Sequence, residues 1–380
     1  MTEWKEYKLG EIASFVTEKV SVQDVKLEDY ISTENMLPDK GGITIASNKP
    51  QEGSATKYFN DTILISNIRP YFKKIWYADK VGGCSNDVLC FKAKDELVFS
   101  KYLYFLLSQD TFFDYVMLGS KGCKMPRGDK SHILNWEISI PSLPTQRRIA
   151  AILSSLDDKI ELLHRENATL EQMAETLFRQ WFVVEAKEEW KEKPLSFFGK
   201  IVCGKTPPKK EKKYFGGQIP FIKIPDMHNN VFVFNSEDTL TEEGVLSQKE
   251  KTIPPFSIIV SCIATVGLVV MNAKKAQTNQ QINSIIPEKE YYRYFLFLHL
   301  RNMYEELNAM ASGGTATLNL NTRNFSKILL PCPTDDYLRV FNEQVKDLFL
   351  KIYSNQKQIQ TLIQTRDGLL PRLMGGEVKM

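Results

Sequence analysis

The sequence predicts an α+β fold in which two strand-rich domains are separated by two long helices. Three observations support this prediction. A length of 380 residues is enough for two or three domains, each with its own core. Short sequence landmarks recur in the same order about 190 residues apart, which indicates an internal repeat. Each strand-rich half is followed by a long apolar repeat typical of a coiled coil.

The repeat is built from matches that are individually weak but keep their order. Trp4-Lys5-Glu6 is matched by Trp190-Lys191-Glu192, the apolar run 63–66 by 258–261, and the polar step 85–88 by 279–282. A glycine-marked loop at 119–124 is matched by 312–317, and I-S-I-P at 138–141 by I-L-L-P at 328–331. The shared order predicts a duplicated chain.

The duplication divides the chain into four segments. Residues 1–143 and 184–332 carry short β-branched and aromatic runs separated by Gly, Pro, Asn and Asp, which is typical of strand-rich α+β domains. Residues 144–183 and 333–380 carry the helical pattern. Pro144 and Pro333 mark the helix starts, and Pro371 with Gly375-Gly376 marks the end of the second helix.

Apolar residues alternate steps of three and four along both helical segments. This spacing is that of a coiled-coil seam, and each seam holds one asparagine, which fixes register at a cost in stability. We therefore expect the helices to pair, the alternative being that each packs only on its own domain. The expected pairing residues are Ile149, Leu156, Ile160, Leu163, Asn167, Leu170 and Leu177 in the first helix, and Leu338, Val345, Leu348, Ile352, Asn355, Ile359 and Leu362 in the second.

The composition argues against secretion, membrane insertion and metal binding. The chain starts without a signal peptide and has no uninterrupted apolar stretch long enough to span a bilayer. Its six cysteines form no C-x-x-C pair, and its four histidines do not fall at metal-ligand spacing. We expect a cytoplasmic protein with free thiols and no metal site.

Two motif matches suggest enzymes but lack the necessary chemistry. Residues 199–206 satisfy the P-loop expression, yet Pro207-Pro208 follows at once and prevents the helix that would cradle a phosphate. Ile253-Pro254-Pro255-Phe256 resembles an adenine methyltransferase motif, but isoleucine cannot accept a hydrogen bond from the adenine amine. No carboxylates and lysine fall at nuclease spacing. We expect no catalytic residue and no bound cofactor in this chain.

Basic and aromatic residues gather in several loops of both halves. Such clusters neutralise DNA phosphates and can present arginine or lysine to base edges, although any single lysine is more often only solvated. The expected DNA-binding residues are Arg69, Tyr71, Lys73, Lys74, Lys124, Arg127 and Lys130 in the first half, and Lys205, Thr206, Lys209, Lys210, Lys274 and Arg323 in the second.

These segments resemble the specificity subunits of type I restriction–modification systems. The resemblance rests on G-K-T-P-P-K-K-E-K-K-Y-F-G-G-Q-I-P-F at 204–221, I-S-N-I-R-P-Y-F-K-K-I-W at 65–76, G-C-S-N-D-V-L at 83–89 and I-S-I-P-S-L-P-T-Q-R-R-I-A at 138–150. The helix ends L-F-R-Q-W-F-V at 177–183 and L-L-P-R-L-M-G-G-E at 369–377 add to it. Thr334-Asp335-Asp336 departs from the usual Gln-Arg-like start of the second helix.

The resemblance implies that residues 1–143 and 184–332 are target-recognition domains for a split DNA sequence. It also implies an antiparallel helix pair that docks two modification subunits, which carry S-adenosylmethionine and methylate adenine, and a separate restriction subunit. Antiparallel helices also follow from the local two-fold axes of duplex DNA, because domains reading opposite strands would be related by such an axis. The alternatives are a solo DNA-modifying enzyme with an unrecognised catalytic domain, and a coiled-coil scaffold without DNA readout.

Overall fold

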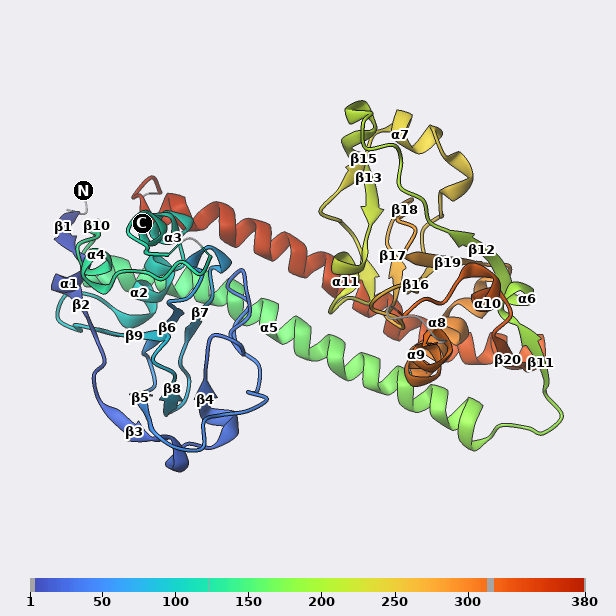
Figure 1. Cartoon of the computed structure of the whole chain (residues 1–380), viewed down its shortest axis with the longest axis horizontal. Helices are drawn as coiled ribbons and strands as arrows, with labels where there is room; N and C mark the ends of the chain where they lie inside the picture. The colour runs from blue at the N-terminus through green and yellow to red at the C-terminus, as the bar shows by residue number, and fades with distance from the viewer. Residues whose placement is uncertain (1–3, 123, 313–317, 379–380) are drawn as a thin grey trace. The chain divides into compact units, whose positions relative to one another are not determined.

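The computed structural model describes residues 4–122, 124–312 and 318–378, which form two compact units (Figure 1). Unit 1 holds residues 1–160 together with 362–380, and unit 2 holds residues 161–361. Each long helix therefore belongs partly to each unit and is not a separate body between two globular domains. Cys123 and residues 313–317 of the second glycine-marked loop lie outside the described residues.

Unit 1 is built from two four-stranded sheets and a two-stranded pair. Their strand orders are β2-β9-β6-β7, β3-β5-β8-β4 and β1-β10, and all neighbours are antiparallel except β4 and β8. The strands are β1 (Lys5–Lys8), β2 (Ala13–Phe15), β3 (Lys19–Ser21), β4 (Tyr30–Ile31), β5 (Ser54–Tyr58), β6 (Ile63–Ser66), β7 (Ile75–Tyr77), β8 (Gly82–Cys84), β9 (Val88–Ala93) and β10 (Glu137–Ile140).

The core of unit 1 includes the end of the chain. The short helices are α1 (Leu9–Ile12), α2 (Ser100–Leu107), α3 (Asp110–Leu118) and α4 (Lys130–Leu134). Their apolar side chains form one buried cluster with strands β6 and β9 and with Leu370, Leu373 and Met374. The C-terminal residues thus complete the core of the domain that the N-terminal half begins.

Unit 2 has a five-stranded sheet of order β12-β19-β16-β17-β14, a three-stranded sheet of order β15-β13-β18 and the pair β11-β20. The strands are β11 (Lys191–Pro194), β12 (Gly199–Cys203), β13 (Phe215–Ile222), β14 (Phe232–Val233), β15 (Thr239–Leu240), β16 (Ile258–Ser261), β17 (Val269–Asn272), β18 (Gln277–Thr278), β19 (Ile282–Pro287) and β20 (Leu329–Cys332). The short helices are α6 (Leu195–Phe198), α7 (Glu242–Leu246), α8 (Arg293–Asn302), α9 (Tyr304–Ala311) and α10 (Thr322–Ser326).

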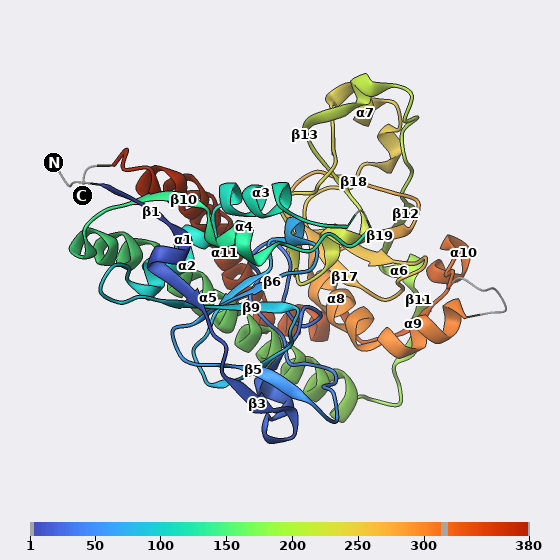
Figure 2. The ribbon, with the colours of Figure 1, turned by 60° about the vertical axis from the view of Figure 1, so that its left-hand side comes forward.

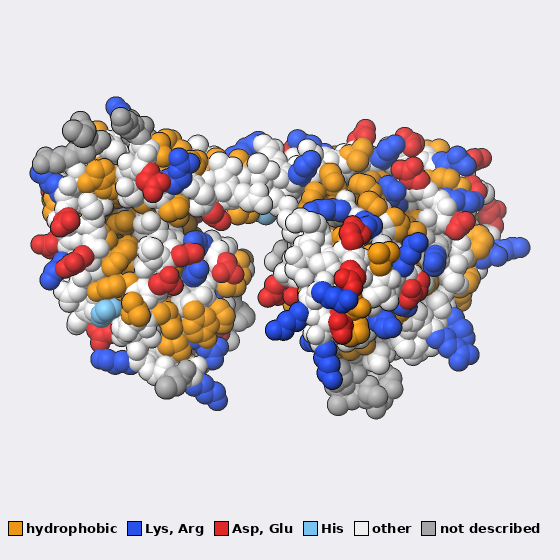
Figure 3. Space-filling model, turned by 90° about the horizontal axis from the view of Figure 1, so that it is seen from above, with side chains coloured by type: hydrophobic (Ala, Val, Ile, Leu, Met, Phe, Trp, Pro, Cys, Tyr) orange, Lys and Arg blue, Asp and Glu red, His pale blue; other side chains and the backbone are white. Residues whose placement is uncertain are grey.

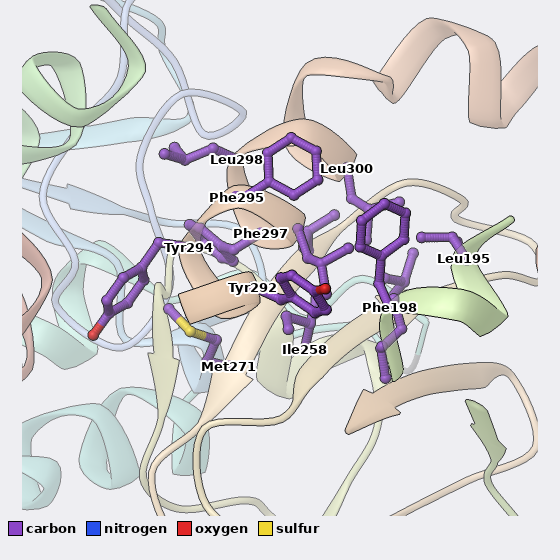
Figure 4. Packing of buried hydrophobic residues seen from close by; sticks show 14 of the residues in the cluster. Leu195, Phe198, Ile258, Met271, Tyr292, Tyr294, Phe295, Phe297, Leu298 and Leu300 are labelled. Atoms are coloured by element: carbon purple, nitrogen blue, oxygen red, sulfur yellow. The ribbon is translucent and has the colours of Figure 1, made fainter. Parts of the chain in front are cut away.

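Helix α8 lies beside strands β16 and β17 of the five-stranded sheet (Figure 2), and an aromatic cluster fills the core of unit 2 at this contact (Figure 4). Phe198 lies with its ring centroid 5.4 Å from Tyr292 and 5.8 Å from Phe295. Ile258 and Met271, which are paired across β16 and β17, contribute to the same cluster. Aromatic side chains bury large apolar areas, so this cluster is a major source of stability for the unit.

The structure confirms the internal duplication. Strands β12, β19, β16 and β17 have the same neighbours as β2, β9, β6 and β7, and β11 pairs with β20 as β1 pairs with β10. The matched segments 63–66 and 258–261 are the corresponding strands β6 and β16. Unit 2 differs by the additional strand β14 at the edge of its sheet.

The long helices are α5 (Leu143–Arg179) and α11 (Asp335–Met374). The first helix begins one residue before Pro144 and ends in a π-helical turn, Gln180–Val184. The second helix ends at Met374, directly before Gly375-Gly376 as expected, but the expectation that Pro371 also marks this end was wrong, because α11 continues through it. A proline inside a helix costs about 3 kcal/mol, and burial of Leu370, Leu373 and Met374 in the core of unit 1 offsets that cost.

Within each unit the helices run side by side in opposite directions. In unit 2 the ring of Trp181 lies 4.8 Å from that of Tyr337, and Asn355 donates a hydrogen bond of 3.0 Å to Asn167. In unit 1 Arg366 bonds Asp157 at 2.9 Å. From one contact to the next, the residue numbers on the first helix fall while those of their partners on α11 rise, so the pair is antiparallel. The helices also pack on the globular cores, for example through Phe349 against Tyr294.

Candidate nucleic-acid interface

In unit 1 three loops meet at one end of the sheet β2-β9-β6-β7. The backbone N–H of Asn67 donates to Asp87 O at 2.8 Å, and that of Arg69 donates to Pro126 O at 2.8 Å. Gly128 N donates back to Asn67 O at 3.3 Å. These bonds join loops that lie about 20 to 60 residues apart in the sequence, and so bring the basic residues at 69–74 together with those at 124–130.

Two arginines extend from these joined loops. Arg69 has a positive φ of 50°, a strained conformation for a non-glycine residue, and its Nε is buried without a hydrogen-bond partner among the described residues. Arg127 donates from Nη2 to Asp87 Oδ1 at 2.6 Å, while its side chain remains mostly exposed. The carboxylate holds one side of the guanidinium and leaves its other donors free for a ligand.

The other predicted DNA-binding residues of unit 1 differ in their exposure and in the protein groups that already bind them. Lys124 is exposed, Lys130 is exposed with its Nζ 5.6 Å from the centre of the Phe15 ring, and Tyr71 is exposed beside Phe72. Lys73 pairs with Asp110 at 3.0 Å. Lys74 donates to Thr33 O at 2.7 Å, and burial lowers the pKa of its ammonium group.

Sequence reasoning missed a polar cleft next to these loops. The cleft has a volume of about 320 Å³ and is lined by Phe15, Thr17, Lys19, Asn86 and Lys130, among others. Lys19 Nζ donates to Asn86 Oδ1 at 2.9 Å and to Thr56 Oγ1 at 3.0 Å. Lys19 lies outside every basic cluster of the sequence, so only the folded arrangement places it near Lys130.

Unit 2 joins three loops in the same way. Cys262 N donates to Gln281 O at 2.8 Å, Ala264 N to Leu318 O at 3.0 Å, and Leu320 N to Cys262 O at 2.8 Å. Thr206 lies at the same end of the five-stranded sheet, where its Oγ1 donates to Gln280 Oε1 at 2.7 Å. The polar step 279–282 therefore lies against residues 204–206, since Gly204 N also donates to Ile282 O at 3.0 Å.

The basic residues of unit 2 are dispersed. Lys205, Lys209 and Lys210 are exposed, and no acidic side chain of the described residues pairs with them. Arg323 is exposed on α10, directly after these loops. Lys274 follows β17 at the opposite end of the five-stranded sheet and bonds Asn235, so the structure does not bring it to the loops.

The P-loop match has the wrong geometry for a phosphate site. Residues 199–203 form strand β12, and Lys205 and Thr206 lie in a loop whose next helical turn begins only at Lys212. A phosphate-binding loop needs a helix that starts at its lysine and threonine. Among the described residues no group of three or more His, Cys, Asp or Glu could hold a metal ion. No described helix is long and apolar enough to cross a membrane.

On the face drawn in Figure 3, Lys and Arg side chains stand among Asp and Glu side chains, in keeping with a formal net charge of only +3. A strong general attraction to DNA is therefore not expected, and individual loops must supply the contacts. The model of the type I restriction modification DNA specificity domain matches residues 1–172 and again residues 187–364. The chain belongs to the family of type I restriction–modification specificity subunits.

Known proteins are similar to this specificity subunit over all or most of its length. The type I restriction enzyme HindI specificity subunit of Haemophilus influenzae is 34% identical, with all of both chains covered. The MjaIX specificity subunit of Methanocaldococcus jannaschii is 29% identical over 76% of this chain and 71% of that one. The S subunit structure from M. genitalium has a TM-score of 0.64 at 16% identity, covering 98% and 96% of the two chains.

The double match assigns a DNA specificity domain to each half of this specificity subunit, so the chain recognises a bipartite target. As a member of this family it is the DNA-recognition subunit and not a catalytic one. The predicted family, fold class and function are confirmed.

Proposed function

We propose that the joined loops of each unit read one half of a split duplex target. These are residues 67–69, 85–87 and 126–128 in unit 1 and residues 262–264, 279–281 and 318–320 in unit 2. The observation that carries the proposal is that both units tie their loops together with the same three backbone hydrogen bonds. Loops fixed in this way can hold side chains at a base edge with little loss of entropy on binding.

We assign different roles to the cations according to their surroundings. Arg69 and Arg127 are the base-edge candidates, since a guanidinium can bond guanine in bidentate fashion. Exposed cations are phosphate contacts, and Lys73 and Lys74 rank below them because protein groups already bind both. The proposed phosphate contacts are Lys124, Lys130, Lys205, Lys209, Lys210 and Arg323, to which we add Lys19.

The helices are the proposed docking surface for two modification subunits, which would carry S-adenosylmethionine, with restriction subunits joining the full complex. Seam residues such as Leu163, Val345 and Ile352 are buried, so they cannot contact a partner without opening the fold. The outward faces carry exposed apolar side chains, Leu162 and Met173 on α5 and Val340 and Leu350 on α11. We therefore assign pairing to the seam and docking to the outward faces. We expect the complex to act on DNA in the cytoplasm.

The test uses this chain in complex with its modification subunits and duplexes in which one half-site, or both, is scrambled. Scrambling either half alone should weaken binding, and scrambling both should reduce it to the non-specific level. An Arg69→Ala, Arg127→Ala variant should lose discrimination at one half-site and keep it at the other. Equal binding of all duplexes by the unmodified complex would contradict the proposal.

A further inference from the structure

The joined loops of the two units share one backbone arrangement, called here the frame: residues 67–69, 85–87 and 126–128 in unit 1 and 262–264, 279–281 and 318–320 in unit 2. The side chains on this frame differ between the units. The bonds from Asn67, Arg69 and Gly128 in unit 1 correspond one by one to those from Cys262, Ala264 and Leu320 in unit 2. A β-bridge joins Ile68 to Arg127, and the equivalent bridge joins Ile263 to Asn319. Arg127 is therefore equivalent to Asn319, Arg69 to Ala264, and Asp87 to Gln281.

The backbone conformation is the same in both units even at a position where the residue types disfavour it. Arg69 and Ala264 both have a positive φ, 50° and 65°, in the left-handed region that residues other than glycine rarely adopt. Such a conformation persists only where the surroundings enforce it, and here the same neighbouring bonds enforce it in both units. The frame is thus common to both units, while the side chains that it presents are not.

We infer that the two half-sites differ in the base read at this frame, guanine by Arg127 in the first and adenine by Asn319 in the second. This inference rests on the proposed function of the loops. Arginine bonds O6 and N7 of guanine in bidentate fashion, and asparagine bonds N6 and N7 of adenine. Arg69 adds a second guanidinium to the first site, whereas Ala264 offers only an apolar contact.

Asp87 is the positioning residue of the first site. Its carboxylate holds Nη2 of Arg127 at 2.6 Å, which fixes the guanidinium plane before DNA binds. The equivalent Gln281 does not hold a cation; its Oε1 accepts a hydrogen bond of 2.9 Å from Asn279. No described residue bonds the exposed side chain of Asn319, so its amide is free to pair with a base.

The test exchanges these side chains in the complete complex and selects bound sequences from duplexes randomised in both half-sites. Asn319→Arg with Gln281→Asp should change one adenine of the second half-site to guanine. Arg127→Asn with Asp87→Gln should make the reverse change in the first. The preference at that position should move by about 5- to 100-fold while the opposite half-site stays unchanged. Arg165→Asn, an exposed arginine of α5 outside the loops, is the matched control and should leave both half-sites unchanged.

A milder variant keeps the test informative if an exchange disturbs folding. Asp87→Asn should relax the guanine preference without weakening binding to random duplex, a result that a merely structural role would not give. If the unmodified complex selects a split target but these variants select the same bases, or lose affinity equally for all sequences, the inference is overturned while the proposed function stands. If the unmodified complex selects no sequence, the proposed function itself fails.

Discussion

At the residue scale, the surroundings of a cation decide whether it is available to DNA. Lys209 and Lys210 are exposed, with no acidic partner among the described residues, whereas Lys213 in the same loop is paired with Glu243. A lysine that already neutralises a carboxylate must give up that partner to bind a phosphate. Neighbouring lysines of one cluster should therefore contribute unequally.

Replacing Lys209 and Lys210 with alanine should weaken binding to cognate and random duplex by the same factor. Each lost phosphate contact should also reduce the slope of log affinity against log salt by about one. The measurement is a salt titration of binding by the complex. Lys213→Ala is the matched control and should have a smaller effect. An unchanged slope in the double variant would show that these lysines are solvated and make no phosphate contact.

His299 supplies a pH-dependent contribution to the stability of unit 2. Burial against Phe178 and Phe295 lowers the pKa of its imidazole to about 4, from the usual 6.5. The unfolded state therefore binds the proton more readily between these values, so stability is full above pH 6.5 and is lost as the pH falls toward 4. The loss should reach at most about 3 kcal/mol.

The measurement is hydrogen exchange of the amides of β16 and β19 in unit 2, at pH values between 7 and 4. His299→Leu should flatten the pH dependence, because leucine takes up no proton and fits the apolar surroundings. His164→Gln, at an exposed position of α5, is the control and should keep the pH dependence of the unmodified protein. The same pH dependence in His299→Leu would show that other groups cause it.

Single residues were also where sequence reasoning was least complete. Arg69 and Arg127 could be proposed as DNA contacts because arginine beside aromatic or glycine residues is a recognisable local pattern. Asp87 and Lys19 were not predicted as site residues, because each bonds a residue far away in the sequence, Arg127 in one case and Asn86 in the other. No local pattern contains that information.

At the scale of elements, the apolar period predicted the long helices well. A seam repeating in steps of three and four is a property of the sequence itself, so both helices and their buried asparagines could be predicted. Gly375-Gly376 correctly marked the end of α11, but the continuation of the helix through Pro371 could not be predicted, because proline normally stops a helix. Its effect is overridden by burial of Leu370 and Leu373 in a core whose other members come from the first half of the chain.

The asparagine pair should fix the alignment of the helices at a cost in stability. Asn355 donates to Asn167 Oδ1 and to Glu166 Oε2, both at 3.0 Å. Asn355→Leu alone should destabilise unit 2 by about 1–3 kcal/mol, because it leaves the buried Asn167 amide unpaired. Replacing both with leucine should recover most of that loss, since neither partner is then left unsatisfied.

A double-mutant cycle followed by hydrogen exchange in unit 2 measures the coupling between these two positions. We expect the two single losses to sum to clearly more than the loss in the double variant. Strictly additive losses would show that the hydrogen bond between the two amides contributes nothing to the pairing of the helices.

At the scale of the whole molecule, the duplication could be read from the sequence but the compact units could not. The linear segments 1–143 and 184–332 follow the repeat, whereas unit 1 also needs residues 362–380 to complete its core. The repeat is visible because matched segments keep their order along the chain. The closing of the core by the C-terminus depends on packing between distant segments.

The central claim is that two units with a common frame read two half-sites independently. Its most direct test exchanges residues 1–160 together with 362–380, which make up unit 1, for those of another specificity subunit with a different target. The methylated motif is then determined by sequencing DNA from cells that carry the complete system. A graft of residues 1–143 alone should fold less well, because Leu370, Leu373 and Met374 would face a foreign core. With both segments exchanged, the first half of the motif should change and the second half should stay the same; a motif that changes in both halves, or in neither, would contradict the account.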